Sequence, residues 1–147
     1  MNVRNEMQIK FPSNSVNEAF ARTAVTLFVS QLDPTMEELT DIKTAVSEAV
    51  TNCIVHAYRE TIGTIVITAK ILEESTVYIK IKDRGIGIGD VKRAMEPLFT
   101  TAPEEERAGL GFAVMESFMD SLRVTSAPGK GTSVVMKKKL TLRGSRD

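Results

Sequence analysis

The sequence is poor in the residues that build disulfides and many metal or nucleophilic sites. It contains one cysteine and one histidine in 147 residues. A single cysteine excludes an internal disulfide and argues against a cysteine-based zinc site. Cys53 stands among apolar residues, so it is predicted to fill the core rather than to act as a nucleophile.

Long apolar runs and a charge excess are also absent. No stretch reaches the roughly 18 uninterrupted apolar residues of a membrane span, and the first residues lack the apolar segment of a signal peptide. We therefore expect a cytoplasmic protein without membrane contact. The 19 basic residues balance the 19 acidic ones, which argues against direct nucleic-acid binding through summed positive charge.

What is present is the composition of one globular domain, with 42% hydrophobic and 26% charged residues. The length allows a single core, which we assign to residues 1–140, followed by a frayed tail at 141–147. Periodicity and capping patterns predict the elements along this domain. They are a strand at Met7–Phe11, a helix capped at Ser15 to about Leu32, a helix capped at Thr35 to about Tyr58, strands at Gly63–Leu72 and Thr76–Asp83, a helix at Gly111–Met119, and strands at Leu122–Ser126 and Thr132–Leu140.

This order of elements predicts an α+β fold. We expect a two-layer α/β sandwich, with the helices over one largely antiparallel mixed sheet. The segment between the second hairpin strand and the third helix is rich in glycine and contains two prolines, and such long loops are often functional. A ligand is therefore expected near this segment.

Glu48 and Asn52 lie four residues apart on the predicted second helix, so their side chains share one stripe beside its apolar face. They can meet a common ligand there. Taken alone, such a pair more often lies solvated on the flank of a helix, so other features must support a site.

Asp83 supplies the first of these features. It has the parity of the apolar residues in "TVYIKIKD", so its carboxylate is predicted to point toward the helices. A buried carboxylate needs a donor, and an exocyclic amine of a ligand would suit it. Alternatively, Asp83 only caps the next turn. Gly85 and Gly87 follow at once and let the backbone approach a flat ligand.

A phosphate site is more plausible at "AGLGFAV", where Gly109 and Gly111 precede or open a helix with free N–H groups. The preceding segment holds Thr100, Thr101 and Arg107. It could close over a triphosphate as a lid.

In this order and spacing, the three segments resemble the N, G1 and G2 boxes of the GHKL ATPase/kinase superfamily. They are "EAVTNCIVHAY", Asp83 to Gly87, and Gly109 to Gly111. The resemblance covers about residues 35 to 136 and implies the Bergerat ATP-binding fold, which agrees with the element order. It also implies ATP and Mg²⁺ as cofactors.

The resemblance implies a role for each matching residue. Glu48 would be the catalytic base, and Asn52 would help to hold Mg²⁺. Asp83 would accept a hydrogen bond from the adenine amine. Gly85 and Gly87 would pack beside the adenine ring, and Thr132 would lie near it. Backbone groups of Gly109, Leu110 and Gly111 would donate to phosphate. Thr100, Thr101 and Arg107 are weaker lid candidates.

Chain length and histidine content narrow the choice of group within the superfamily. The chain has no room for the further domains of gyrase, Hsp90 or mismatch-repair ATPases. Sensor histidine kinases need a phosphoacceptor histidine on a separate dimerising hairpin, whereas the only histidine here, His56, lies on the same helix as Glu48 and is read as structural. The stretches around Glu48 and Gly111 are similar to the stand-alone serine-kinase anti-sigma factors. This group implies a homodimer that sequesters a sporulation sigma factor of the sigma-F type and phosphorylates an anti-anti-sigma protein on serine. A general stress-response anti-sigma kinase, an ATP-gated binding module without kinase activity and a plain ATPase remain alternatives.

The predicted first helix carries apolar residues over roughly 220°, wider than one core-facing stripe requires. One side should stay exposed in a lone subunit and meet a second copy or a protein partner, with Arg22 at its polar edge. The alternative is that the sheet and the second helix cover it completely. The apolar residues are Val16, Phe20, Ala21, Ala24, Val25, Leu27, Phe28, Val29 and Leu32.

Overall fold

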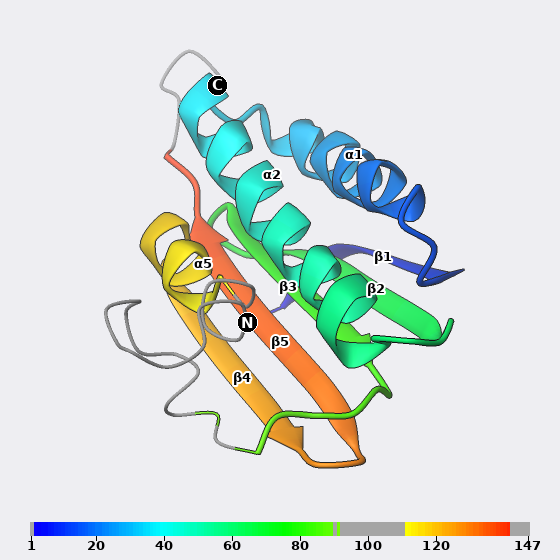
Figure 1. Cartoon of the computed structure of the whole chain (residues 1–147). Coiled ribbons are helices and arrows are strands. Elements are labelled where there is room, and N and C mark those ends of the chain that lie inside the picture. Colours follow the sequence, from blue (N-terminus) through cyan, green and yellow to red (C-terminus); the bar gives the residue numbers. More distant parts are fainter. Residues whose placement is uncertain (1, 90, 92–110, 142–147) are drawn as a thin grey trace.

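The computed structural model describes residues 2–89, 91 and 111–141 of the chain. A five-stranded sheet in the order β1-β2-β3-β5-β4 carries the helices on one face (Figure 1). This arrangement confirms the predicted two-layer α+β sandwich. The elements are β1 (Val3–Pro12), α1 (Asn17–Val29), η1 (Ser30–Leu32), α2 (Met36–Thr51), η2 (Asn52–Ala57), β2 (Thr64–Leu72), β3 (Thr76–Asp83), α5 (Phe112–Phe118), β4 (Ser121–Ala127) and β5 (Gly131–Lys139).

All four strand pairings in the described part of the chain are antiparallel. The sheet is thus antiparallel throughout this part, and the parallel pair implied by a mixed sheet is not found there. The register shows why β1 and β2 pair in the antiparallel direction. Pro12 at the end of β1 pairs with Thr64 at the start of β2, because the two intervening helices return the chain to the same end of the sheet.

The core lies between the sheet and the helices. Alternate residues of β2 and β3 point into it, including Ile67, Ile79 and Ile81, each at most 1% exposed. This is the period-two pattern that the sequence predicted, and it carries Asp83 to the same face. Among the described helices, none is long and apolar enough to cross a lipid bilayer.

The two predicted capping boxes had different outcomes. The Thr35 hydroxyl accepts the Glu38 N–H at 3.1 Å, and the Glu38 carboxylate accepts the Thr35 N–H at 2.9 Å, as predicted. The predicted capping box at Ser15 was wrong, because no side chain caps α1. Backbone carbonyls occupy that role instead, since the Glu18 N–H donates to the Ser15 carbonyl at 3.2 Å.

The apolar residues of α1 divide into two faces. Ala21, Val25 and Val29 are completely buried against the core. On the outer side, Phe20 is 53% exposed and Leu27 is 69% exposed. The predicted excess of apolar surface is therefore present in the single subunit, and the alternative that the fold covers it completely is wrong.

Candidate functional site

Asp83 occupies a buried position at the end of β3. Its side chain is 5% exposed, and its Oδ1 accepts the backbone N–H groups of Gly85 at 2.8 Å and Thr132 at 3.2 Å. Its Oδ2 accepts the thiol of Cys53 at a sulfur–oxygen distance of 3.5 Å. Burial raises the pKa of Asp83, and the hydrogen bonds that it accepts only partly oppose this rise. Capping of the next turn would explain the hydrogen bond from the Gly85 N–H to Oδ1. It does not explain the contact of Oδ2 with the Cys53 thiol.

The glycines after Asp83 are needed because backbone groups crowd them. A Cβ on Gly85 would overlap the carbonyl of Ala57, and a Cβ on Gly87 would overlap the carbonyl of Ala127. Gly87 also has a φ of +78°, a conformation that favours glycine. The loop is held between the end of η2 and the β4–β5 turn. The Ile86 N–H donates to the Ala57 carbonyl at 3.1 Å.

Thr132 lies beside Asp83 at the start of β5 and is 9% exposed. Its Oγ1 is 2.7 Å from the Oγ of Ser126. Ser126 also accepts the N–H of Ile88 at 2.8 Å and thereby joins the glycine loop to the β4–β5 hairpin. Ser126 was not predicted from the sequence, and it belongs to this polar cluster through the β4–β5 pairing, which places it opposite Thr132.

Glu48 lies in the last turn of α2 and is half-buried. Burial raises the pKa of its carboxyl group. Gly111, immediately before α5, lies against this carboxylate, because a Cβ on Gly111 would overlap Glu48 Oε2. Gly111 has a φ of +58°. The structure thus brings together the second helix and the start of the third.

Asn52 follows Glu48 by one turn and is 9% exposed. At this residue α2 widens into the π-helical segment η2. Such widened turns occur often at functional sites, because they redirect side chains out of the regular helical register. The sequence placed Asn52 on the correct helix but gave no sign of the wider turn.

Two further residues, Cys53 and Tyr58, belong to this region, although the sequence did not predict them as part of it. Cys53 is buried, as predicted for a core residue, but its thiol also contacts Asp83. Burial and the neighbouring carboxylate raise the pKa of this thiol well above its ordinary value. The Tyr58 hydroxyl accepts the Arg84 N–H and donates to the Thr64 carbonyl, both at 2.7 Å. It fixes the point where the glycine loop begins.

The predicted residues thus fall into three groups. Those in the described part cluster where α2 and η2 meet the end of β3, the start of β5 and the start of α5: Glu48, Asn52, Asp83, Gly85, Gly87, Gly111 and Thr132. The others lie outside the described residues: Thr100, Thr101, Arg107, Gly109 and Leu110. Arg22 lies apart on α1, where its Nε is 3.0 Å from a carboxylate oxygen of Glu18.

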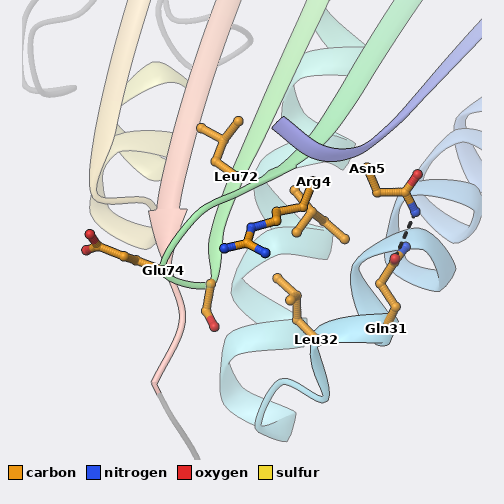
Figure 2. A pocket seen from close by; sticks show the side chains of 8 residues that line it. Arg4, Asn5, Gln31, Leu32, Leu72 and Glu74 are labelled. Atoms are coloured by element: carbon orange, nitrogen blue, oxygen red, sulfur yellow. Dashed lines mark hydrogen bonds between the residues drawn. The ribbon is translucent and has the colours of Figure 1, made fainter. Parts of the chain in front are cut away.

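A separate cavity of about 460 Å³ lies at the opposite end of β3, beside the β2–β3 turn (Figure 2). Arg4, Leu32 and Leu72 are among its lining residues. The side-chain amide of Asn5 donates to Gln31 Oε1 at 2.8 Å across one edge. None of the predicted site residues lines this cavity, so it is distinct from the cluster around Asp83.

Sequence relatives match almost the whole chain. A protein named "Anti-sigma F factor" from Caldanaerobacter subterraneus subsp. tengcongensis is 61% identical to this chain, over 94% of this chain and 96% of the relative. The protein of that name in Pasteuria penetrans is 59% identical, over 93% and 92%. That in Clostridium acetobutylicum is 51% identical, over 95% and 97%.

Solved structures share the fold at lower identity. The RsbU and RsbW domains of a Mycobacterium tuberculosis protein superpose with a TM-score of 0.69 at 19% identity, over 95% of this chain and 33% of that chain. A blue-light activated histidine kinase of Erythrobacter litoralis gives 0.60 at 18% identity, over 84% and 42%. Residues 11–138 match the family model described as "Histidine kinase-like ATPase domain". The chain therefore belongs to the histidine kinase-like ATPase domain family, and its relatives include proteins named Anti-sigma F factor.

Proposed function

We propose that this chain is an anti-sigma factor with protein serine kinase activity. It binds magnesium–ATP, sequesters a sigma factor of the sigma-F type and phosphorylates an anti-anti-sigma protein on serine in the cytoplasm. The observation that carries the proposal is that η2, which holds Asn52, meets the end of β3 through the contact of the Cys53 thiol with Asp83, in a member of an ATPase-domain family. The names of the relatives support the anti-sigma role.

The adenine end of the site would be formed by Asp83, Thr132 and the glycine loop. A buried carboxylate that keeps acceptor capacity on Oδ2 suits the 6-amino group of adenine. The absence of a Cβ lets Gly85 and Gly87 pack against the carbonyls of Ala57 and Ala127, and this packing would hold the loop beside the adenine. These features fit a 6-aminopurine better than a phosphate group, which the carboxylate would repel.

The phosphate end would lie between Asn52 and Gly111. Asn52 supplies an amide oxygen of the kind that Mg²⁺ accepts, and bound Mg²⁺ would neutralise charge between the phosphates. Within the described residues, no three His, Cys, Asp or Glu side chains gather to hold a metal. Mg²⁺ is usually held by substrate phosphates together with one or two protein groups, and Asn52 would be such a group. Backbone groups of Gly109, Leu110 and Gly111, and the lid residues Thr100, Thr101 and Arg107, remain part of the proposal.

Glu48 would act as the general base. Its carboxylate takes the proton from the serine hydroxyl as the serine oxygen bonds to the γ-phosphorus and the bond to the β-phosphate oxygen breaks. Burial raises the pKa of Glu48, which strengthens it as a proton acceptor. A pure binding module would not need a base at this position.

The outer face of α1 would be the protein-binding surface. Val16 is 75% exposed, and Phe20 and Leu27 are also largely exposed. Exposed apolar residues on one helix face are typical of association surfaces. We assign this face to a homodimer or to the sigma factor, with Arg22 at its edge.

The test combines the purified chain, γ-labelled ATP and a purified anti-anti-sigma protein. Transfer of label to a serine of that protein, lost in Glu48→Gln, is expected. Release of inorganic phosphate without transfer would favour a plain ATPase, and equal transfer by Glu48→Gln would exclude the base role. A pull-down from cell lysate with ATP or ADP would separate a sporulation sigma factor from a stress-response one.

A further inference from the structure

The sheet face turned away from the helices is strongly basic. The strand register places three rows of side chains across it: Lys10, Val66, Lys82, Ser133 and Thr125; Gln8, Thr68, Lys80, Val135 and Arg123; and Glu6, Lys70, Tyr78, Lys137 and Ser121. We call these three rows the open sheet face. Six of these positions carry a cation, namely Lys10, Lys70, Lys80, Lys82, Arg123 and Lys137, and only Glu6 carries an acid.

These cations are not neutralised within the described part of the chain. The ion pairs found there join Arg22 to Glu18, Lys138 to Asp41 and Lys139 to Glu74, and none involves the open sheet face. Lys70 and Lys137 instead stand over the ring of Tyr78, with Nζ at 5.0 and 6.0 Å from its centroid. Within the described residues, no carboxylate is therefore paired with the charged ends of Lys70 and Lys137.

The zero net charge of the chain hides a separation of charge. The segment from α1 to η2 contains acids at Glu18, Asp33, Glu37, Glu38, Asp41 and Glu48, against the cations Arg22 and Lys43. Acids therefore predominate on the helical layer and cations on the opposite sheet face. Net charge therefore does not describe the local charge of either surface.

The composition of the open sheet face favours a phosphate backbone over a protein as its partner. Protein interfaces need buried apolar anchors and are poor in lysine. The apolar residues on this face, Val66 and Val135, are only partly exposed, and no large exposed hydrophobic of the described chain lies there. Phosphate contacts use lysine and arginine together with Ser, Thr, Gln and Tyr side chains, and the remaining positions supply these groups.

We propose that the open sheet face binds the phosphate backbone of double-stranded DNA without sequence preference. The acidic helical layer would face away from the DNA, so the outer face of α1 and the Asp83 site would stay accessible. Binding of this kind is purely electrostatic, with dissociation constants of about 10⁻⁴ to 10⁻⁶ M at physiological salt. It depends on neither nucleotide binding nor phosphoryl transfer.

The test is fluorescence anisotropy of a labelled duplex oligonucleotide, titrated with the full chain at stepped salt concentrations. The logarithm of the affinity should fall linearly with the logarithm of the salt concentration, with a slope of about −0.9 for each phosphate neutralised. The variant Lys82→Gln/Arg123→Gln/Lys137→Gln removes three of these cations. Its slope should be less steep by about 2.7, which is three times 0.9.

The matched control is Lys43→Gln/Arg59→Gln/Lys130→Gln, which removes the same charge from exposed positions outside the open sheet face. It should keep the salt slope of the unmodified chain. Both variants should keep their circular dichroism spectra and magnesium–ATP binding, which shows that the fold is intact.

Three results would overturn the proposal. The first is no binding to duplex DNA at low salt. The second is an equal loss of affinity in the control variant, which would show that only the overall charge matters. The third is equally tight binding of poly-glutamate of matched charge, which would indicate an acidic protein partner. Failure of ATP binding would not affect the proposal, since the two surfaces are tested separately.

Discussion

Gly111 lies directly against the carboxylate of Glu48, so that a methyl group on Gly111 would overlap Glu48 Oε2. The two residues are 63 positions apart in the sequence, from 48 to 111. Glu48 is the proposed base in α2, and Gly111 immediately precedes α5. The position of the proposed base is therefore coupled to the place where the third helix starts.

Gly111→Ala should impair phosphoryl transfer, because the new methyl group displaces the Glu48 carboxylate. The φ of +58° adds a backbone cost of about 1–2 kcal/mol for any residue with a Cβ. Gly129→Ala is the matched control, since Gly129 has a φ of +76° but open space around its Cβ position. Both variants should lose stability in urea, and only Gly111→Ala should lose transfer rate. Equal transfer rates would show that this contact is irrelevant.

Glu48→Gln should lower the rate of serine phosphorylation about 10²- to 10⁴-fold, because the general base is lost. In the unmodified chain, the rate should rise with pH as Glu48 ionises, at a pKa above its ordinary value of 4.5. The variant should lack this rise while binding ATP nearly as well. The measurement is a pH–rate profile, with Glu116→Gln on the exposed side of α5 as control. If the rate of the Glu48→Gln variant still rises with pH, that rise reports the ionisation of another group.

Asp83→Asn should separate stability from ligand binding. The raised pKa of Asp83 means that its ionised form is less favourable in the folded chain than in the unfolded one, and this cost is present above the folded-state pKa. The Asn oxygen can still accept the N–H groups of Gly85 and Thr132. We expect a free energy of unfolding at pH 7 that is unchanged or higher.

The same variant should bind ATP about 10²-fold less tightly, because a charge-assisted hydrogen bond is lost. Purine riboside triphosphate, which lacks the 6-amino group, is the control ligand and should bind both chains alike. Denaturant unfolding and competition titrations provide the measurements. A parallel loss for both nucleotides would mean that Asp83 does not read the amine.

Glu38→Ala should destabilise the fold by about 1–2 kcal/mol. The Glu38 carboxylate completes the capping box with Thr35 and accepts the N–H of Thr141 at 2.7 Å, which ties the end of the described chain to α2. Burial acts to raise the pKa of Glu38, but its hydrogen bonds together outweigh burial and lower it. Its contribution is therefore present above the unfolded-state pKa and is lost as pH falls through the folded-state pKa.

Urea unfolding of Glu38→Ala at neutral and acidic pH checks this expectation. Glu37→Ala, at the exposed neighbouring position, is the control and should change little. If the two variants lose the same stability at neutral pH, the bonds to Thr35 and Thr141 contribute nothing specific.

Leu27→Asp should weaken self-association or sigma-factor binding, because it places a charge on the exposed apolar face of α1. Val25 is unsuitable as a probe of this face, since it is fully buried. Ile62→Asp, at a residue that is 60% exposed elsewhere, is the matched control. Light scattering should show a dimer for the unmodified chain and the control. A Leu27→Asp protein that stays dimeric and still captures the sigma factor would remove this face from the proposal.

The sequence predicted well what local rules determine. The parity of Asp83 with Ile79 and Ile81 gave its direction, and the Thr35 pattern gave the start of α2. The same rule was wrong at Ser15, because backbone carbonyls from the preceding turn already satisfied the first N–H groups of α1. Local patterns are therefore reliable only where no backbone partner competes.

Contacts between distant segments could not be predicted in the same way. The approach of Gly111 to Glu48 and of Cys53 to Asp83 depends on how the helices are placed over the sheet. The wider turn at Asn52 also leaves no trace in hydrophobic periodicity. The candidate site residues were thus proposed from their order, their spacing and the resemblance that these carry, whereas the contacts with Ser126, Cys53 and Tyr58 required the three-dimensional structure.

Calorimetric titration of magnesium–ATP into the unmodified chain, Asp83→Asn and Asn52→Ala tests the proposed site at both of its ends. We predict one nucleotide bound per chain, with affinity lost at the adenine end in Asp83→Asn and at the phosphate end in Asn52→Ala. No heat of binding to the unmodified chain, or equal affinity in all three proteins, would contradict a nucleotide site between α2, η2 and β3.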